Sequence, residues 1–169
     1  MANIYLFSGP CGCGKTTLSS VFAEHLGQPV YLIHGDDFQA GFITPADADG
    51  PAWPEILRFN WECILASTRS ALALGVDVVI DYVVEDELPL MQALARDFGA
   101  ALYYVVLTAD APTLQGRLKQ RGDAWLTERA LFLKAKLDAL PENQGHLFDL
   151  TGLSIDEALA RLQADRYIL

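Results

Sequence analysis

The chain has 169 residues, of which 51% are hydrophobic, so it is long enough for one domain with a substantial core. Its net charge of −10 would repel a polyanion, and no apolar stretch approaches the length of a membrane span, so we expect no nucleic acid and no membrane among its partners. Three cysteines without a framework of pairs, and no basic segment ahead of the first apolar run, predict a soluble cytoplasmic protein, whose oligomeric state the sequence leaves open.

Apolar runs typical of strands alternate along the chain with segments of helical periodicity, and no repeat or linker interrupts them. The predicted strands are residues 3–7, 30–33, 76–84, 101–107 and 146–149. The predicted helices are residues 15–26, 55–74, 87–98, 111–120 and 127–140, followed by a last helix that begins near Ser154. Strands that are apolar almost throughout are typical of parallel sheets buried on both faces. We therefore predict one α/β domain over residues 1–169, a three-layer, doubly wound, five-stranded parallel sheet.

The turn between the first predicted strand and the first predicted helix reads G-P-C-G-C-G-K-T-T. It fits G-x-x-x-x-G-K-[ST], the pattern of a phosphate-binding P-loop, in which glycines adopt positive φ so that N–H groups can surround phosphate oxygens. Lys15 is expected to reach the β- and γ-phosphates, and the Thr16 hydroxyl is expected to hold Mg²⁺. The expected nucleotide-binding residues of this loop are Gly9, Cys11, Gly12, Cys13, Gly14, Lys15, Thr16 and Thr17.

Acidic residues follow the second and third predicted strands. Asp36 and Asp37 come directly after the second strand, and Asp81 follows V-V-I in the third, which is similar to the Walker B pattern. In a doubly wound sheet the ligand binds at the carboxyl ends of the strands, so these side chains should meet there. We expect Asp81 to support the metal behind Thr16, and Asp36 to orient an acceptor hydroxyl and accept its proton.

The P-loop together with Asp36-Asp37-Phe38 resembles the small P-loop kinases that phosphorylate hydroxyl groups of metabolites or drugs. The resemblance is to the group of nucleoside kinases, chloramphenicol phosphotransferase, and gluconate and shikimate kinases, and it implies the P-loop NTPase fold of the kinase type with ATP and Mg²⁺. The resemblance to nucleoside kinases and chloramphenicol phosphotransferase implies that Asp36 is the catalytic base. Gluconate and shikimate kinases instead place a carboxylate closer to Asp37. The choice between these neighbours stays open.

The segment R-L-K-Q-R, residues 117–121, lies at the end of the helix after the fourth predicted strand and resembles the lid of these kinases. The resemblance implies that Arg117 lies near adenine and that Arg121 stabilises charge on the transferred phosphoryl group, as a catalytic residue beside Lys15 and Asp36. A planar, permanently charged guanidinium suits both tasks. The expected lid is short, about residues 117–129, and Arg129 is a weaker candidate within it.

The acceptor is expected to bind over residues 37–62. Between Gly35 and Glu87 the only basic residues are Arg58 and Arg69, which disfavours a strongly anionic acceptor. Aromatic side chains in the same span can enclose a ring, and Trp53, in a Pro-rich loop, is the best placed of them to touch it. The expected acceptor-binding residues are Asp36, Asp37, Phe38, Trp53 and Arg58.

We therefore predict an ATP-dependent kinase that transfers the γ-phosphate to an alcohol group of a neutral or cationic, ring-containing acceptor. Two alternatives stay open: a nucleotide-binding module or switch without turnover and, within the kinases, a sugar-acid kinase of the gluconate or shikimate type. A guanine-reading N-K-x-D signature is absent, which counts against a switch. The preference for ATP over GTP rests on the resemblance alone.

Overall fold

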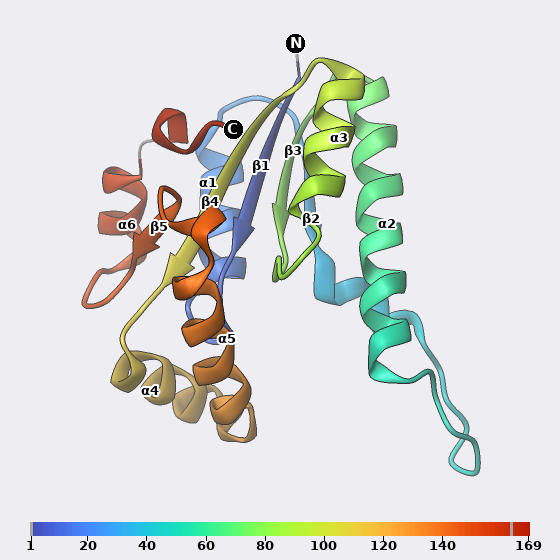
Figure 1. Ribbon diagram of the computed structural model, residues 1–169, viewed down its shortest axis with the longest axis vertical. Coiled ribbons are helices and arrows are strands. Elements are labelled where there is room, and N and C mark those ends of the chain that lie inside the picture. The colour runs from blue at the N-terminus through green and yellow to red at the C-terminus, as the bar shows by residue number, and fades with distance from the viewer. Residues whose placement is uncertain (1, 163) are drawn as a thin grey trace.

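Five parallel strands form a sheet of order β2-β3-β1-β4-β5 in the computed structural model, which describes residues 2–162 and 164–169 (Figure 1). The strands are β1 (Asn3–Ser8), β2 (Val30–His34), β3 (Asp77–Asp81), β4 (Ala101–Thr108) and β5 (Leu147–Asp149). Every neighbouring pair is parallel, with β1 between β3 and β4. The α/β class and the five-stranded parallel sheet predicted from the sequence are confirmed.

Helices connect successive strands and cover both faces of the sheet (Figure 1). The α-helices are α1 (Lys15–His25), α2 (Trp53–Ala73), α3 (Leu88–Phe98), α4 (Ala111–Arg121), α5 (Thr127–Ala139) and α6 (Ile155–Arg161). The short 3₁₀ helices are η1 (Gly35–Gly41), η2 (Ala124–Leu126), η3 (Pro141–Asn143) and η4 (Ala164–Tyr167). Among the residues described, no helix combines the length and apolar character needed to cross a bilayer.

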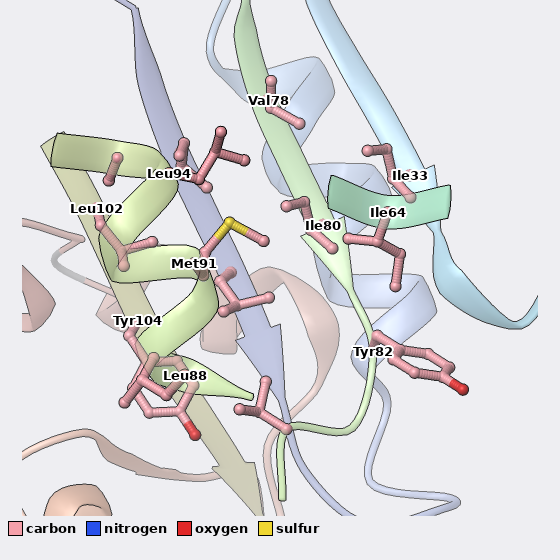
Figure 2. Packing of buried hydrophobic residues seen from close by; sticks show 14 of the residues in the cluster. Ile33, Ile64, Val78, Ile80, Tyr82, Leu88, Met91, Leu94, Leu102 and Tyr104 are labelled. Atoms are coloured by element: carbon pink, nitrogen blue, oxygen red, sulfur yellow. The ribbon is translucent and has the colours of Figure 1, made fainter. Parts of the chain in front are cut away.

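The central strand β1 contributes to two hydrophobic cores, one on each face of the sheet. Successive side chains of a strand point to opposite faces, so Ile4 and Leu6 join one core while Tyr5 and Phe7 join the other. The first core contains side chains of α2 and α3 packed against β3 and β4 (Figure 2). The second contains side chains of α1, α4 and α6. This double burial explains why the central strands are apolar almost throughout.

Strand β3 is shorter than the prediction of 76–84, because its parallel ladder with β1 ends at Asp81. Beyond this point β1 turns into the phosphate loop and offers no further strand partner. Tyr82 and Val84 nevertheless stay buried, and the Ser8 hydroxyl accepts a hydrogen bond of 2.9 Å from the main-chain N–H of Val84. The apolar run that predicted a longer strand is thus a buried loop.

Helix α2 begins at Trp53, earlier than predicted. Pro54 fits the first turn of a helix, where its missing N–H is not needed, and the Glu55 carboxylate accepts a hydrogen bond of 2.8 Å from the Ala52 N–H. The loop before it, residues 42–52, extends away from the body of the molecule (Figure 1).

The strands point their carboxyl ends to the bottom of the view in Figure 1, where α4 and one end of α5 also lie. The phosphate loop, η1 and the loop after β3 begin at these strand ends. Parallel pairing brings them together, and they carry most of the residues that the sequence singles out.

Candidate functional site

The phosphate loop has the backbone that its glycines predict. Gly9, Gly12 and Gly14 all adopt positive φ, at 142°, 78° and 109°. A Cβ at Gly9 would lie 2.3 Å from the carbonyl oxygen of Leu107, so only glycine allows the loop to approach β4 this closely. Gly14 is the N-cap of α1, whose N-terminus is therefore directed into the loop.

The side chain of Lys15 folds back over the phosphate loop. Its Nζ donates hydrogen bonds to the main-chain carbonyls of Gly9, at 2.9 Å, and Pro10, at 3.1 Å. The two cysteines of the loop differ: Cys13 is fully buried, and its burial raises the pKa of the thiol, whereas Cys11 lines the cavity described below. The ammonium of Lys15 is thus held where an anion in the loop would be bound.

Asp81, almost completely buried at the end of β3, gathers polar side chains behind the loop. Its carboxylate accepts hydrogen bonds from the hydroxyls of Thr16, at 3.4 Å, and Ser19, at 2.8 Å, and lies 2.5 Å from Nδ1 of His34. A hydroxyl and a carboxylate are the hard oxygen ligands that Mg²⁺ prefers, so Thr16 and Asp81 fit that ion. Neither Ser19 nor His34 was predicted from the sequence as a site residue, although Ser19 lies one helical turn after Thr16.

A cavity of about 680 Å³ opens at the carboxyl edge of the sheet. The phosphate loop and η1 contribute to its walls, together with α2, the loop after β3, and the segment from the end of α4 into α5. Its lining residues are Cys11, Gly12, Gly14, Lys15, Thr16, Thr17, Asp36, Gln39, Trp53, Leu57, Trp61, Tyr82, Val83, Glu85, Glu87, Arg121, Asp123, Trp125, Leu126, Arg129 and Leu133.

Asp36 lines this cavity from η1 and is still open to solvent. Desolvation by the surrounding protein raises the pKa of its carboxyl group, and the negative charges of Asp81 and Asp37 act in the same direction. The positive charges of Lys15 and Arg121 act against them. A carboxylate with raised proton affinity, beside the lysine of the phosphate loop, is suited to accept a proton.

Three residues expected to bind the acceptor lie outside the cavity lining. Asp37 is exposed, and Phe38 packs at the edge of the core under α2. Arg58 is exposed on α2, where it pairs with Glu62 at 3.6 Å, one helical turn away. Trp53 does line the cavity, from the first position of α2, with 52% of its surface exposed.

Arg117 and Arg121 of the expected lid have different surroundings. Arg117 donates hydrogen bonds to the main-chain carbonyls of Cys13, at 2.7 Å, and Leu150, at 3.4 Å, so it connects the phosphate loop to the end of β5. Arg121 lines the cavity and pairs with Asp123 at 2.5 Å. In this segment, Arg121 therefore belongs to the cavity wall, whereas Arg117 supports the phosphate loop.

A second ion-pair cluster joins the loop after β3 to α5. The Glu85 carboxylate accepts hydrogen bonds from Arg129, at 2.5 Å, and Lys136, at 2.8 Å. Burial alone would raise the pKa of Glu85, but these two cations lower it overall. Sequence pattern alone does not pair Glu85 with Arg129 or Lys136, because these partners are far away in sequence.

Aromatic side chains form much of the remaining wall. The rings of Trp61 and Tyr82 meet edge to face, with centroids 5.5 Å apart. Trp125, in η2, also lines the cavity while 76% of its surface is exposed. Trp125 was not predicted from the sequence as a site residue; the only local signal is a tryptophan in the short segment between α4 and α5.

Solved structures with the same fold include several kinases. The APS kinase of Mycobacterium tuberculosis, in complex with AMPPNP and APS, gives a TM-score of 0.66 at 20% identity, over 94% of each chain. The tunicamycin resistance protein of Deinococcus radiodurans gives 0.64 at 18% identity, over 95% of this chain and 93% of that one. A gluconokinase of Sinorhizobium meliloti gives 0.57 at 20% identity, over 97% and 94%.

No curated protein matches this chain in sequence. The AAA domain family, however, matches residues 4–163, nearly the whole chain. The sheet order, the phosphate loop at its centre and the structural neighbours all agree with this match. The chain belongs to the AAA domain family, and its fold is that of the small P-loop kinases.

Proposed function

We propose that this protein is an ATP- and Mg²⁺-dependent phosphotransferase that moves the γ-phosphate to a hydroxyl group of a neutral or cationic, ring-containing small molecule. The observation that carries the proposal is that Lys15, Thr16 and Asp36 line one cavity. The proposed phosphate donor site and the proposed proton acceptor therefore share one space, which phosphoryl transfer requires and nucleotide binding alone does not.

In this scheme the N–H groups of the phosphate loop and the N-terminus of α1 hold the β- and γ-phosphates. Lys15 exchanges its contacts with the carbonyls of Gly9 and Pro10 for phosphate oxygens. Thr16 and Asp81 would hold Mg²⁺, which supplies positive charge beside the phosphates when it is bound.

Asp36 acts on the other substrate. It orients the acceptor hydroxyl and takes its proton while the hydroxyl oxygen bonds to the γ-phosphorus. The bond from the γ-phosphorus to the bridging oxygen breaks, and ADP leaves with the electron pair. Arg121, in the cavity wall, would stabilise charge on the moving group, and Arg117, between the phosphate loop and the end of β5, would lie on the adenine side.

The walls of the cavity favour an acceptor without strong negative charge. Trp53, Trp61 and Tyr82 provide aromatic surface. Arg58 lies outside the cavity lining and forms an ion pair with Glu62. A sugar-acid kinase would need a cation for the carboxylate of its substrate. The lining cations Lys15, Arg121 and Arg129 are instead assigned to the phosphates or paired with acids.

The first test measures ADP release from ATP and Mg²⁺ with nucleosides, aminoglycosides, chloramphenicol-like alcohols, gluconate and shikimate as acceptors. We expect stimulation by one neutral or cationic class. In Asp36→Asn, phosphoryl transfer should fall by at least about 100-fold, the usual contribution of a positioned base, with ATP affinity within a few-fold of wild type. Titration of a fluorescent ATP analogue checks the affinity.

Two results would contradict the proposal. Equal loss of ATP affinity in Asp36→Asn would make Asp36 a metal or structural residue rather than the base. Tight ATP binding with no stimulation by any class would favour a nucleotide-binding module without turnover, and stimulation by gluconate or shikimate alone would favour a sugar-acid kinase.

A further inference from the structure

A buried amide joins two side chains of the cavity wall that the scheme above does not use. Asn60, on α2, is completely buried, and its Nδ2 donates hydrogen bonds to the hydroxyl oxygen of Tyr82, at 2.9 Å, and to Oε1 of Gln39, at 3.2 Å. Tyr82 and Gln39 both line the cavity, from the loop after β3 and from η1. One buried nitrogen therefore fixes two polar groups of the wall.

The ring of Tyr82 is also held in place from other sides. Trp61 packs against it edge to face, and a Cβ at Gly35 would lie 2.4 Å from the ring, so η1 rests on the ring through a glycine. Figure 2 shows Tyr82 at the end of β3, with its hydroxyl extending away from that strand. Asp36 follows Gly35 directly, and its negative charge is one of the causes that raise the pKa of Tyr82, so Tyr82 and the residue assigned as base belong to the same part of the cavity wall.

The direction of these hydrogen bonds determines what the two groups can offer a ligand. Asn60 donates to both oxygens, so the Tyr82 O–H and the Gln39 Nε2 remain as donors, and neither donates to an acceptor among the described residues. Burial raises the pKa of Tyr82, so its hydroxyl keeps the proton. The Oδ1 of Asn60 is itself buried without a partner in the described chain, although most buried polar atoms have one.

The carboxylates nearby are largely engaged by the protein itself. Glu85 is paired with two cations, Asp123 pairs with Arg121, and Glu87 accepts hydrogen bonds of 3.0 Å from two main-chain N–H groups. Asp36 is the lining carboxylate that accepts no hydrogen bond from the described residues, and the proposed function reserves it for the acceptor hydroxyl. Beside Asp36, the Tyr82 O–H and the Gln39 Nε2–H are thus donors that the described residues leave free.

We propose that the Tyr82 hydroxyl and the Gln39 side-chain amide bind an oxygen atom of the acceptor, which is accordingly an uncharged ring molecule with a carbonyl, ether or hydroxyl oxygen close to the phosphorylated alcohol. This inference rests on the proposed function and narrows its substrate class. An alkylammonium group has donors only, so it could use neither the Tyr82 O–H nor the Gln39 Nε2–H. Of the neutral and cationic acceptors, the structure therefore assigns the neutral, oxygen-bearing ones.

The test uses the full chain with uridine and chloramphenicol as neutral, oxygen-bearing probes and kanamycin as an amine-bearing probe. Tyr82→Phe keeps the ring against Gly35 and removes only the hydroxyl. Its control is Tyr31→Phe, because Tyr31 lies on β2, 46% exposed and outside the cavity lining. Turnover gives KM for acceptor and for ATP separately, and calorimetry gives acceptor affinity without turnover.

We expect a neutral probe to be accepted, and Tyr82→Phe to raise its KM and its dissociation constant about tenfold, the usual effect of one lost hydrogen bond, while KM for ATP stays unchanged. Gln39→Glu, which keeps an oxygen for Asn60 but loses the donor, should act in the same direction. The melting temperature should fall in either case, because Tyr82→Phe also removes an oxygen that accepts a hydrogen bond from the buried Asn60. A merely structural role would change both KM values instead.

Three results would overturn the inference: acceptance of kanamycin alone, a Tyr82→Phe variant indistinguishable from Tyr31→Phe, or no binding of either neutral probe. A different result would separate the two claims: calorimetry shows that a neutral probe binds, and that Tyr82→Phe weakens this binding, but no probe is phosphorylated. That result would support this binding site and refute the proposed phosphoryl transfer. The two claims therefore fail separately.

Discussion

Asp36 is a carboxylate of the cavity wall whose surroundings oppose its own charge. Desolvation, together with Asp81 and Asp37, raises its pKa above the ordinary value of 3.8 in spite of the cations opposite. The folded protein therefore binds this proton more tightly than the unfolded chain does. Stability from this group is present at low pH and declines as pH rises through the interval between the unfolded and the folded pKa.

At the residue scale we predict that Asp36→Asn increases the free energy of unfolding at pH 7, because it removes a charge that the folded site disfavours. The difference in the free energy of unfolding between Asp36→Asn and wild type should shrink as the pH is lowered to the ordinary aspartate pKa of 3.8 and below. Urea unfolding at several pH values measures it. Asp37→Asn is the control, since Asp37 is exposed outside the cavity; an equal gain there, or a loss in Asp36→Asn, would contradict the prediction.

Among elements, the loop after β3 and helix α5 are connected through Glu85. Arg129 and Lys136 both donate to this partly buried carboxylate, and they lower its pKa against the effect of burial. Arg129 lies in the cavity wall, so the same pairing sets the position of one lining cation. A folded pKa below the unfolded one means that this stability is present above the unfolded pKa and is lost as pH falls through the folded pKa.

For this pair of elements we predict that Glu85→Gln lowers the free energy of unfolding by about 1–2 kcal/mol at pH 7, because two partly buried, charge-assisted hydrogen bonds weaken. The difference from wild type should vanish in acid, once Glu85 is protonated. Glu62→Gln, which breaks the exposed pair with Arg58, should change stability by no more than about 0.5 kcal/mol. Equal effects of the two substitutions, measured by urea unfolding, would show that Glu85 is an ordinary surface acid.

For the whole molecule, the cavity is a product of the folded state. Its walls come from the phosphate loop, η1, α2, the loop after β3 and the lid segment, which are distant in sequence and adjacent only in the fold. A ligand that binds here binds the native state and not the unfolded chain. Its binding free energy therefore adds to the stability of the whole sheet.

We predict that MgADP at 100 times its dissociation constant raises the free energy of unfolding by about 2.7 kcal/mol, visible as a higher melting temperature. Lys15→Met should remove most of this shift, because it removes the ammonium held over the loop. Lys119→Met is the matched control, since Lys119 is exposed on α4 and outside the cavity lining. A full shift in Lys15→Met would refute the assignment of the phosphate site.

The sequence by itself determined the phosphate loop and the class of the fold. The loop chemistry is carried by consecutive residues, and the positive φ values of Gly9, Gly12 and Gly14 are local properties that the motif encodes. The parallel sheet followed from strands that are apolar on both faces. Asp81 was predictable for the same reason, because it directly ends such a run.

Only the tertiary structure decided which distant side chains share the cavity. Glu85 and Arg129 pair across many residues, Asn60 joins Tyr82 to Gln39, and the end of β3 is set by where β1 turns away. The local pattern of apolar residues predicts the buried face of each helix or strand, but it does not predict which side chains pack against that face. That partner depends on how the layers pack around the sheet, and this packing also leaves Phe38 and Arg58 outside the cavity while Trp125 lines it.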